Sequence, residues 1–476
     1  MAEPPNALTE MLWAGRLRGC TRRVIPGGKM RELMTQSRPS RRKWTMRMAG
    51  PAIVLGALVG LAVVASAPPV WGAGADSSHV VAALRVLEQY YFTPVDPTYL
   101  LNGAIAGLRK ATNLESGLLP DIPTGLPEAL AVSTFQQRFT QATQSNKKPE
   151  IDLAYQATRE MLASLHDGDT YFMDPAELAE QKKRSAGAAP WVGIGVTIRS
   201  EKDAVGIEWI FVEDVYPGSP AQSAGLRRFD RIVSVDGKPL RNLTISEILQ
   251  LLRGQPGSTA SLVIQRGSAK LDISAIRAPI RLLPRVQMIR PGVAYVRIFY
   301  FSEGTGEQVR SALRSLAPQS AIRGVVLDLR GNGGGYLSEI QSVAGVFLPS
   351  QTVVAHVIRH AGTSALVATG ELLFPSVPMS VLSDNATVGG ALMMGLRTER
   401  RATIIGERSE GIGGSGVDFP LPTGGMHITV EMVVGPHSEP LQGVGVTPDS
   451  EVALTEADME RGVDTQLDVA LKSVGG

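Results

Sequence analysis

Residues 324–335 read Gly324-Val325-Val326-Leu327-Asp328-Leu329-Arg330 and then Gly331-Asn332-Gly333-Gly334-Gly335. A continuous apolar run that ends in a glycine cluster is typical of a central strand of an α/β layer fold, followed by a loop with accessible backbone donors. Before this run, residues 293–299 predict a further strand and Thr305–Leu316 a helix. We therefore expect an α/β core over residues 281–456, followed by a C-terminal helix over residues 457–476.

The composition limits the classes of protein that this chain can be. With 476 residues, it exceeds what one hydrophobic core usually organises, which predicts at least two folded units. Its 43% hydrophobic and 19% charged residues exclude wholesale disorder. The 47 Lys and Arg residues against 45 Asp and Glu leave a formal charge of +2, too small to indicate a nucleic-acid partner. The single cysteine, Cys20, excludes an internal disulfide.

The amino-terminal residues carry the pattern of an export segment. No residue from Ala49 to Ala67 is charged, and at about 1.5 Å per residue the run can cross a hydrocarbon layer. The preceding basic residues, which keep the start of a signal in the cytoplasm, are Arg38, Arg41, Arg42, Lys43 and Arg47. We expect a polar, basic tail over residues 1–46 and a signal peptide or membrane anchor over 47–75, with cleavage and retention both open. The remainder is expected in the periplasm or cell envelope, attached to the membrane through residues 49–67 if uncleaved.

Apolar spacing typical of helices follows, at His79–Tyr91, Leu100–Leu108 and Leu153–Leu165. These helices predict a helical segment over residues 76–185. Between them, residues 113–149 contain several prolines and a polar stretch, which predicts a mostly loop-rich insertion. The composition of residues 185–190 indicates a linker and a domain boundary.

From residue 191 the sequence changes to short β-rich runs. Strands are predicted at 193–198, 210–212, 232–238 and 260–265, and an amphipathic helix at Ile245–Leu252. Residues 186–280 resemble a PDZ domain, a small β-barrel with helices. The resemblance rests on Gly193-Ile194-Gly195-Val196 at the place of the carboxylate-binding loop and on Ser219-Pro220-Ala221 before Ala224-Gly225-Leu226. Phe229 replaces the glycine that usually precedes the aspartate, so we expect that turn to be made differently.

The resemblance to a PDZ domain implies a peptide-binding site. A glycine-flanked loop can direct backbone N–H groups at a terminal carboxylate, and an exposed strand edge can accept an extended peptide. We therefore predict that Gly193, Ile194, Gly195 and Val196 bind C-terminal or unfolded segments of other proteins. The alternative is that Gly193 and Gly195 only relieve crowding where a strand begins. Together with the helical segment and the α/β core, this domain makes the predicted fold class multidomain α+β.

The glycine-rich segment and several later motifs closely resemble the carboxyl-terminal processing peptidases, the tail-specific serine proteases of cell envelopes. The segments that carry the resemblance are Leu327–Gly335, Ala344–Pro349, Ala402–Glu407, Phe419–Gly425 and Leu441–Asp449. The segments that look like the helical amino-terminal part of that family are Pro94–Pro97, Leu162–Asp167 and Tyr171–Pro175. The resemblance spans residues 78–455, interrupted by 113–149.

This resemblance implies a specific catalytic apparatus. It consists of a serine nucleophile activated by a lysine, a glutamine that orients the lysine, and an oxyanion hole of glycine N–H groups, here Gly334 and Gly335. Counted from Gly406-Glu407, the nucleophile position falls on Thr387, the base position on Ile412 and the orienting position on Gly416.

All three catalytic side chains are thus replaced. Isoleucine cannot accept a proton, and the only lysine from Arg281 onward is Lys472. A threonine hydroxyl without a base is a negligible nucleophile. The usual Ser/Lys chemistry is therefore predicted to be missing, and whether another peptidase activity survives is left open.

Three functional hypotheses remain. In the first, a non-catalytic relative binds protein tails through its PDZ domain and holds an extended segment in the glycine-walled cleft. In the second, an active serine-type peptidase has a rearranged site that pairs a serine with a histidine, drawn from Ser383, Ser409, Ser415, His427, His437, His356 and His360. The third, a structural envelope protein, predicts a filled cleft near Thr387, Gly334 and Gly335. No metal or cofactor is expected, since the sequence around His166 is typical of a helix-ending turn.

Overall fold

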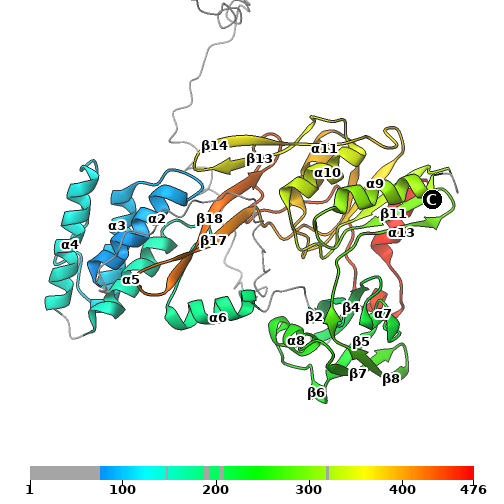
Figure 1. The fold of residues 1–476 in the computed structure, drawn as a ribbon, viewed down its shortest axis with the longest axis horizontal. Coiled ribbons are helices and arrows are strands. Elements are labelled where there is room, and N and C mark those ends of the chain that lie inside the picture. Colours follow the sequence, from blue (N-terminus) through cyan, green and yellow to red (C-terminus); the bar gives the residue numbers. More distant parts are fainter. Residues whose placement is uncertain (1–75, 146–147, 187–191, 203–207, 318–320, 476) are drawn as a thin grey trace, which may run out of the picture. The chain divides into compact units, whose positions relative to one another are not determined.

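The computed structural model describes residues 76–145, 148–186, 192–202, 208–317 and 321–475, which fall in one compact unit (Figure 1). The predicted basic tail, the apolar segment 49–67 and residues 187–190 of the predicted linker lie outside the described residues. Within the described ranges, no helix combines the length and the apolar character needed to cross a membrane.

The described chain begins with helices that pack side by side (Figure 1). They are α2 (Ser77–Tyr90), α3 (Pro97–Thr112), α4 (Glu128–Gln144) and α5 (Glu150–Ala163). Asp76 and Asp96 cap α2 and α3, because each carboxylate accepts hydrogen bonds from N–H groups of the first turn. The helices predicted from apolar spacing are confirmed as α2, α3 and α5.

Helix α4 corrects the prediction of a mostly loop-rich insertion at 113–149. The helix buries Ala131, Phe135, Phe139 and Ala142, which lie three or four residues apart and join the same apolar core as α2, α3 and α5. The remaining positions of α4 are largely polar, so the mean hydropathy of the helix is low. Its sequence pattern is therefore hard to distinguish from that of a loop. Helix packing overrides the weak local signal here.

An antiparallel sheet follows the helical segment. Its strands are β1 (Tyr171–Met173), β13 (Val353–Arg359), β14 (Gly362–Val367), β17 (Gly414–Pro420) and β18 (Gly425–Val434). The order is β1-β18-β13-β14, and β17 also pairs with β18. Phe172 lies opposite Met426, and both side chains are buried in the helical core. Helix α6 (Pro175–Ala186) continues through Ser185, so the predicted linker begins inside a helix.

The PDZ-like region has a six-stranded sheet. The strands of the region are β2 (Val192–Gly193), β3 (Val196–Lys202), β4 (Glu208–Val215), β5 (Arg231–Val235), β6 (Lys238–Pro239), β7 (Thr259–Arg266), β8 (Ala269–Ile276) and β9 (Ala278–Pro279). Its helices are α7 (Pro220–Ser223) and α8 (Ile245–Leu252). In the order β3-β4-β5-β7-β8, strand β3 lies at an edge, and β2 pairs separately with β9. Helix α8 begins with a capping box between Thr244 and Glu247 and buries Ile248 and Leu252, as its amphipathic pattern predicts.

The turn at Phe229 differs from the expectation. Phe229 itself adopts φ +70°, the left-handed region that favours glycine, so the backbone of the turn is kept despite the larger residue. Its ring packs beside a small apolar cluster of Phe211, Leu454 and Met459. The Arg228 guanidinium also lies 4.6 Å from the centre of the Phe229 ring. These contacts compensate for the unfavourable backbone conformation.

The α/β core confirms the two strands and the helix predicted around the glycine cluster. Its six-stranded sheet consists of β10 (Arg285–Arg290), β11 (Val293–Arg297), β12 (Gly324–Asp328), β15 (Met379–Ser383), β16 (Thr403–Gly406) and β19 (Ser450–Glu451). All neighbours are parallel except the edge pair β10–β11. The helices of the core are α9 (Thr305–Leu316), α10 (Leu337–Phe347) and α11 (Gly390–Thr398).

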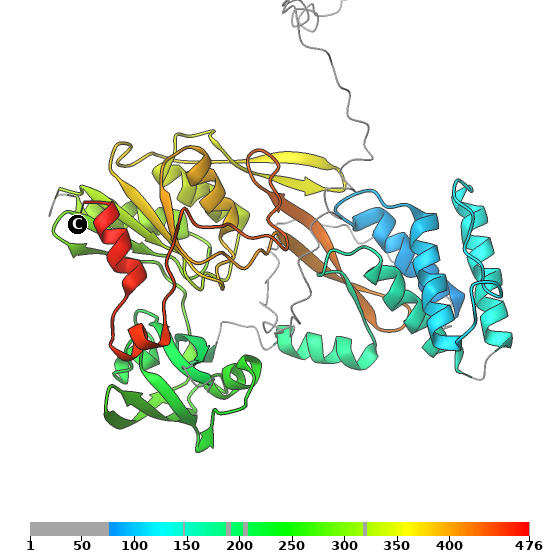
Figure 2. The ribbon, with the colours of Figure 1, turned by 180° about the vertical axis from the view of Figure 1, so that it is seen from behind.

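The predicted C-terminal helix is divided into α12 (Glu456–Glu460) and α13 (Thr465–Ser473). Gly462, at φ +69°, stands between them. Figure 2 shows α13 beside the sheet. Ala470, Leu471 and Val474 pack there against Val326 and Leu382 of the strands, in a core separate from the one that includes residues of α9, α10 and α11.

Candidate functional site

The predicted nucleophile position, Thr387, lies in the turn between β15 and α11 and is fully buried, at 0% exposure. Its hydroxyl donates a hydrogen bond to Asp384 Oδ1 at 2.7 Å and lies 3.1 Å from the carbonyl oxygen of Leu329. The same hydroxyl accepts from the backbone N–H of Asp384 at 3.0 Å. Thr387 therefore closes the turn, and no part of its side chain faces solvent.

Within the described residues, Asp384 is the only residue whose side chain is hydrogen-bonded to Thr387. Its Oδ1 atom also accepts from the N–H groups of Gly331 at 2.8 Å and Ala386 at 3.1 Å. A carboxylate is a far weaker base than a neutral lysine amine, so this contact does not supply the base that the family resemblance implies. Lys472 lies exposed on α13 and contacts none of these residues.

The predicted base and orienting positions hold no ionisable side chain, and the space beside one of them is occupied. Ile412 is half-buried just before β17. A Cβ atom added to Gly416 would lie 2.1 Å from His427 Nε2, so the imidazole occupies the volume that any side chain at position 416 needs. His427 is held there by Asp418, whose Oδ1 lies 2.5 Å from Nδ1, and by stacking on Tyr171 with ring centres 5.3 Å apart.

The predicted oxyanion-type loop is partly occupied by internal contacts. The N–H of Gly334 donates to Asn332 Oδ1 at 2.9 Å, and its carbonyl accepts from the N–H of Phe301 at 2.8 Å. A Cβ on Gly334 would lie 3.1 Å from Val388, and a Cβ on Gly335 only 2.5 Å from the carbonyl oxygen of Phe301. Thr387 lies buried in the neighbouring turn, so the loop and the turn are closely packed.

No contact among the described residues supports the hypothesis of a rearranged serine–histidine site. The Ser409 hydroxyl accepts from the N–H of Val446 at 2.7 Å, and Ser383 Oγ is buried. Across the described ranges, no hydrogen bond joins a candidate serine to a candidate histidine among Ser383, Ser409, Ser415, His427, His437, His356 and His360.

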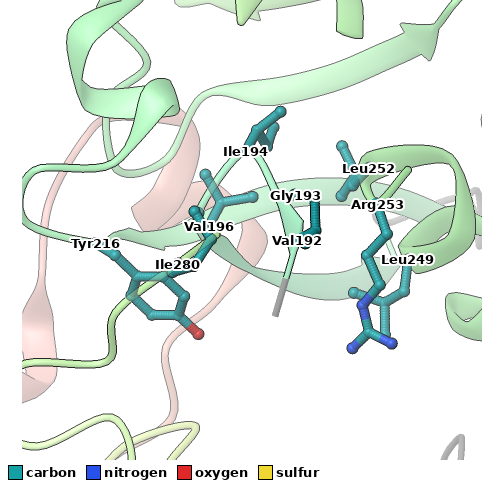
Figure 3. Close-up of a pocket in the computed structure, with 10 residues that line it drawn as sticks. Val192, Gly193, Ile194, Val196, Tyr216, Leu249, Leu252, Arg253 and Ile280 are labelled. Atoms are coloured by element: carbon teal, nitrogen blue, oxygen red, sulfur yellow. The ribbon is translucent and has the colours of Figure 1, made fainter. Parts of the chain in front are cut away.

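The predicted peptide-binding residues line a pocket of the PDZ-like region, drawn in Figure 3. Its walls are largely apolar, and α8 forms one of them. The lining residues are Val192, Gly193, Ile194, Gly195, Val196, Tyr216, Leu249, Leu252, Arg253 and Ile280. The structure thus brings together all four residues that the sequence singled out.

The loop in this pocket has a backbone donor to offer. The carbonyl groups of Ile194 and Gly195 accept from the N–H groups of Ala221 at 2.8 Å and Tyr216 at 3.0 Å. The N–H group of Gly195, in contrast, donates to no acceptor within the described residues, although the residue is buried. Crowding explains why position 195 is a glycine, because a Cβ on Gly195, at φ +84°, would lie 2.4 Å from the Cβ of Ser219. Crowding does not explain the unused donor.

Sequence reasoning missed several lining residues. Leu249 and Arg253 lie four residues apart at the C-terminal end of α8, and this helical spacing is a signal that could have found them. Tyr216 and Ile280 give no such signal, because only the fold brings them to the loop. Burial raises the pKa of the Tyr216 hydroxyl and lowers the pKa of the Arg253 guanidinium.

A cluster of buried charges connects β3 and β4 with the turn that contains Thr387. Arg199 Nη2 donates to both carboxylate oxygens of Glu407, at 2.8 and 2.9 Å. Its Nη1 atom lies 3.9 Å from Glu213 Oε1 and 3.9 Å from Asp384 Oδ2. Burial raises the pKa of Glu213 to about 8, and the negative charge of Asp384 acts in the same direction. No sequence pattern predicted this cluster.

Two family models match the chain. The model of Peptidase family S41 matches residues 292–452, and a PDZ domain model matches residues 211–266. Thr387, Ile412 and Gly416 all lie within the first matched region. The loop at residues 193–196 precedes the second.

Individual proteins show the same similarity. A carboxyl-terminal-processing protease of Picosynechococcus sp. is 33% identical over 312 residues, which cover 63% of this chain and 73% of that protein. A protein of the same description from Synechocystis sp. is 30% identical over 335 residues, which cover 68% and 77%. Among solved structures, a Bacteroides fragilis protein described as an S41 protease superposes with a TM-score of 0.51 at 19% identity and covers 82% of this chain and 96% of that one. This last similarity supports the fold alone.

Proposed function

This chain belongs to the family of carboxyl-terminal-processing proteases, and from that premise we propose that it binds the C-terminal segments of other proteins through its PDZ domain without the usual Ser/Lys peptidase chemistry. The bound segments would be C-terminal or unfolded parts of proteins that end in an apolar residue.

One observation carries this proposal. The N–H group of Gly195, a buried residue, has no acceptor within the described part of the chain, and it belongs to a loop that lines an apolar pocket. A buried donor without a partner is costly, and a terminal carboxylate supplies the acceptors. The apolar lining from Leu249, Leu252 and Ile280 suits an apolar last side chain.

The core contributes a scaffold in this proposal. Thr387 is buried with its hydroxyl committed to Asp384, and Ile412 cannot take its proton. The filled surroundings of Thr387 and Gly334 therefore favour the structural hypothesis for the core, and they give no support to an extended segment held in that cleft. We propose the combination of a binding PDZ domain with a structural core.

The location follows from the amino-terminal pattern. The apolar run at residues 49–67 behind a basic tail indicates export, with the binding domain in the periplasm or cell envelope. Retention of this run would also attach the chain to the membrane.

Binding and cleavage can be measured on the full chain in mild detergent. We expect a fluorescent peptide with an apolar last residue and a free carboxylate to bind, its amidated form to bind much more weakly, and an unfolded tail-tagged protein to remain intact. Equal binding of the acid and the amide would remove the PDZ proposal. Turnover of the tail-tagged protein that Ser415→Ala abolishes would establish the rearranged peptidase instead.

A further inference from the structure

A polar pocket of about 420 Å³ lies at one end of the six-stranded sheet of the core. Its lining includes Met379 and Thr403, the first residues of β15 and β16. The turn that contains Thr387 follows the other end of β15, and the loop at residues 331–335 follows the other end of β12. Because these strands are parallel, the pocket and the Thr387 turn lie at opposite ends of the strands.

Three arginines line this pocket, against one acidic residue. Arg397 lies in the last turn of α11, and Arg400 and Arg401 follow that helix. Among the described residues of the lining, Asp449 is the only other charged one. The lining therefore carries a formal charge of +2, three positive charges less one negative charge. A pocket of this charge attracts anions.

Arg401 keeps a positive charge at the wall of the pocket without an anionic partner. Its guanidinium donates to the carbonyl oxygens of Phe347, Phe374 and Val377, at 3.1, 3.1 and 2.9 Å. Within the described ranges no carboxylate pairs with the guanidinium, and burial lowers its pKa. Since an arginine stays charged in proteins, an anion in the pocket would balance this charge better than carbonyl groups alone.

Arg397 and Arg400 have donors left for a ligand. Arg397 Nη1 donates to the carbonyl oxygen of Thr447 at 2.8 Å, and it lies 3.9 Å from Asp449 Oδ1, beyond hydrogen-bond distance. The exposed Arg400 side chain makes no hydrogen bond or ion pair with any residue that the structure describes. Most N–H groups of the two guanidinium ions are thus available to an anion.

The backbone at Arg400 gives an independent indication that its side chain is used. Arg400 adopts φ +52°, in the left-handed region that favours glycine. Its N–H donates to the carbonyl of Arg397 at 2.9 Å, and the N–H of Arg401 donates to that of Leu396 at 2.8 Å, a pattern that ends helices and usually has glycine at this position. A role for the guanidinium in the pocket accounts for an arginine where glycine would be unstrained.

The charge and the size of the pocket suit a phosphate group. A phosphate monoester carries a charge of about −1.5 to −2 at pH 7, which balances the lining, whereas a carboxylate carries a single negative charge. Guanidinium groups donate pairs of N–H groups to phosphate oxygens. The volume falls within the range of small-molecule sites, so the group esterified to the phosphate can also enter.

We propose that this pocket binds a phosphate monoester, whose oxygens accept hydrogen bonds from Arg397 and Arg400 while Arg401 supplies a third positive charge. The ester is either a free small molecule or the headgroup of an anionic lipid, since both present the same phosphate. This binding site is independent of the PDZ pocket and of peptide binding.

Isothermal titration calorimetry on the full chain in mild detergent tests the proposal. The probes are inorganic phosphate, glycerol phosphate and short-chain phosphatidic acid, with inorganic sulfate and short-chain phosphatidylcholine for comparison. The variants are the double change Arg397→Gln with Arg400→Gln, and Asp449→Asn. Arg408→Gln removes an exposed arginine of the same core outside the pocket and serves as the matched control.

We expect the double change to weaken binding of glycerol phosphate at least about tenfold, because two charged donors are lost. Asp449→Asn should tighten binding about threefold, because it removes a repelling charge and keeps an acceptor for the N–H of Ile404. Arg408→Gln should match the parent chain. Inorganic phosphate should bind more tightly as the pH rises through about 6, where it gains its second charge, and sulfate should not change.

The outcomes decide both the site and the source of the phosphate. Tighter binding of phosphatidic acid than of glycerol phosphate, with no binding of phosphatidylcholine, identifies a lipid headgroup, and the reverse order identifies a soluble ester. A parent chain that binds none of the phosphate probes, or a folded double variant that binds them as tightly as the parent, refutes the proposal. Thermal unfolding verifies folding, and if the double variant is unfolded, Asp449→Asn decides, because equal or weaker binding in that variant also refutes the site.

Discussion

The loop at Gly193–Val196 and the turn at Asp384–Val388 are both recognised by their sequence, but they differ in what their polar groups do. In the loop, the N–H group of Gly195 has no acceptor within the described residues. In the turn, the Thr387 hydroxyl and Asp384 Oδ1 are both saturated by neighbours. In the proposed function the loop binds a peptide and the turn is structural, and the difference between their hydrogen-bond partners is what suggests these two roles.

Asp384→Ala should have the largest effect and tests the structural side of the comparison. The substitution removes an acceptor shared by Thr387, Gly331 and Ala386, so we expect the free energy of unfolding to fall by about 4 kcal/mol. Denaturant unfolding measures this loss, with the exposed Asp272→Ala as the control. A stability equal to that of the parent chain would contradict a structural turn.

Gly416→Gln, which puts the family's glutamine back at the orienting position, should be the next most disruptive. The added side chain collides with the His427 imidazole, so we expect a loss of about 3 kcal/mol and no gain of peptidase activity, even combined with Thr387→Ser and Ile412→Lys. His427→Ala in the same chain should recover part of the stability, because it vacates the space. Cleavage of an unfolded substrate by the triple variant would show that the site is still intact.

Gly195→Ala tests the binding side. Position 195 has φ +84°, and its Cβ would lie 2.4 Å from that of Ser219, so the loop must shift and its N–H groups must turn. We expect peptide affinity to fall at least tenfold and the free energy of unfolding to fall by about 2 kcal/mol. Gly218→Ala, also at positive φ but with open space around it, is the control for backbone strain alone. Unchanged affinity in Gly195→Ala would exclude the loop from binding.

The smallest expected effect is the change of the free energy of unfolding with pH. It arises from Glu213, which lies in the charge cluster beside the turn. The pKa of Glu213 is raised from its ordinary 4.5 to about 8 by burial and by Asp384, with Arg199 and Arg297 opposing the shift. The folded state therefore binds more protons than the unfolded state between these values, so stability is fully present below pH 4.5 and declines as the pH rises toward 8.

Unfolding midpoints measured across this pH range should show a decline of about 1 kcal/mol, because Arg199 compensates part of the charge that Glu213 acquires. Glu213→Gln should flatten the decline. The exposed Glu399→Gln is the matched control. A decline that persists in Glu213→Gln would assign the effect to another group.

Much of the fold follows from local patterns. Apolar spacing predicted α2, α3, α5, α8 and α9, and the run before the glycine cluster predicted β12, since these elements bury a face whose period is visible in the chain. Helix α4 was not predicted because its buried apolar face is narrow and lies among polar residues. The conformation of the turn at Phe229 was not predicted, because packing against distant residues such as Leu454 compensates for the unfavourable backbone conformation of Phe229.

The candidate sites, too, were predicted only in part from the sequence. The resemblance to known families pointed to the Gly193–Val196 loop and to the predicted catalytic positions Thr387, Ile412 and Gly416. It could not show that the His427 side chain occupies the space beside Gly416, nor that Arg253 and Tyr216 line the same pocket.

By itself, the sequence determined which residue type stands at each position, such as isoleucine at the predicted base position, because the chemistry of a side chain is a property of its residue type. Only the tertiary structure decided which hydroxyls and N–H groups already have partners. Hydrogen bonds and steric occupancy depend on residues that are far apart in the chain, and folding alone brings them together.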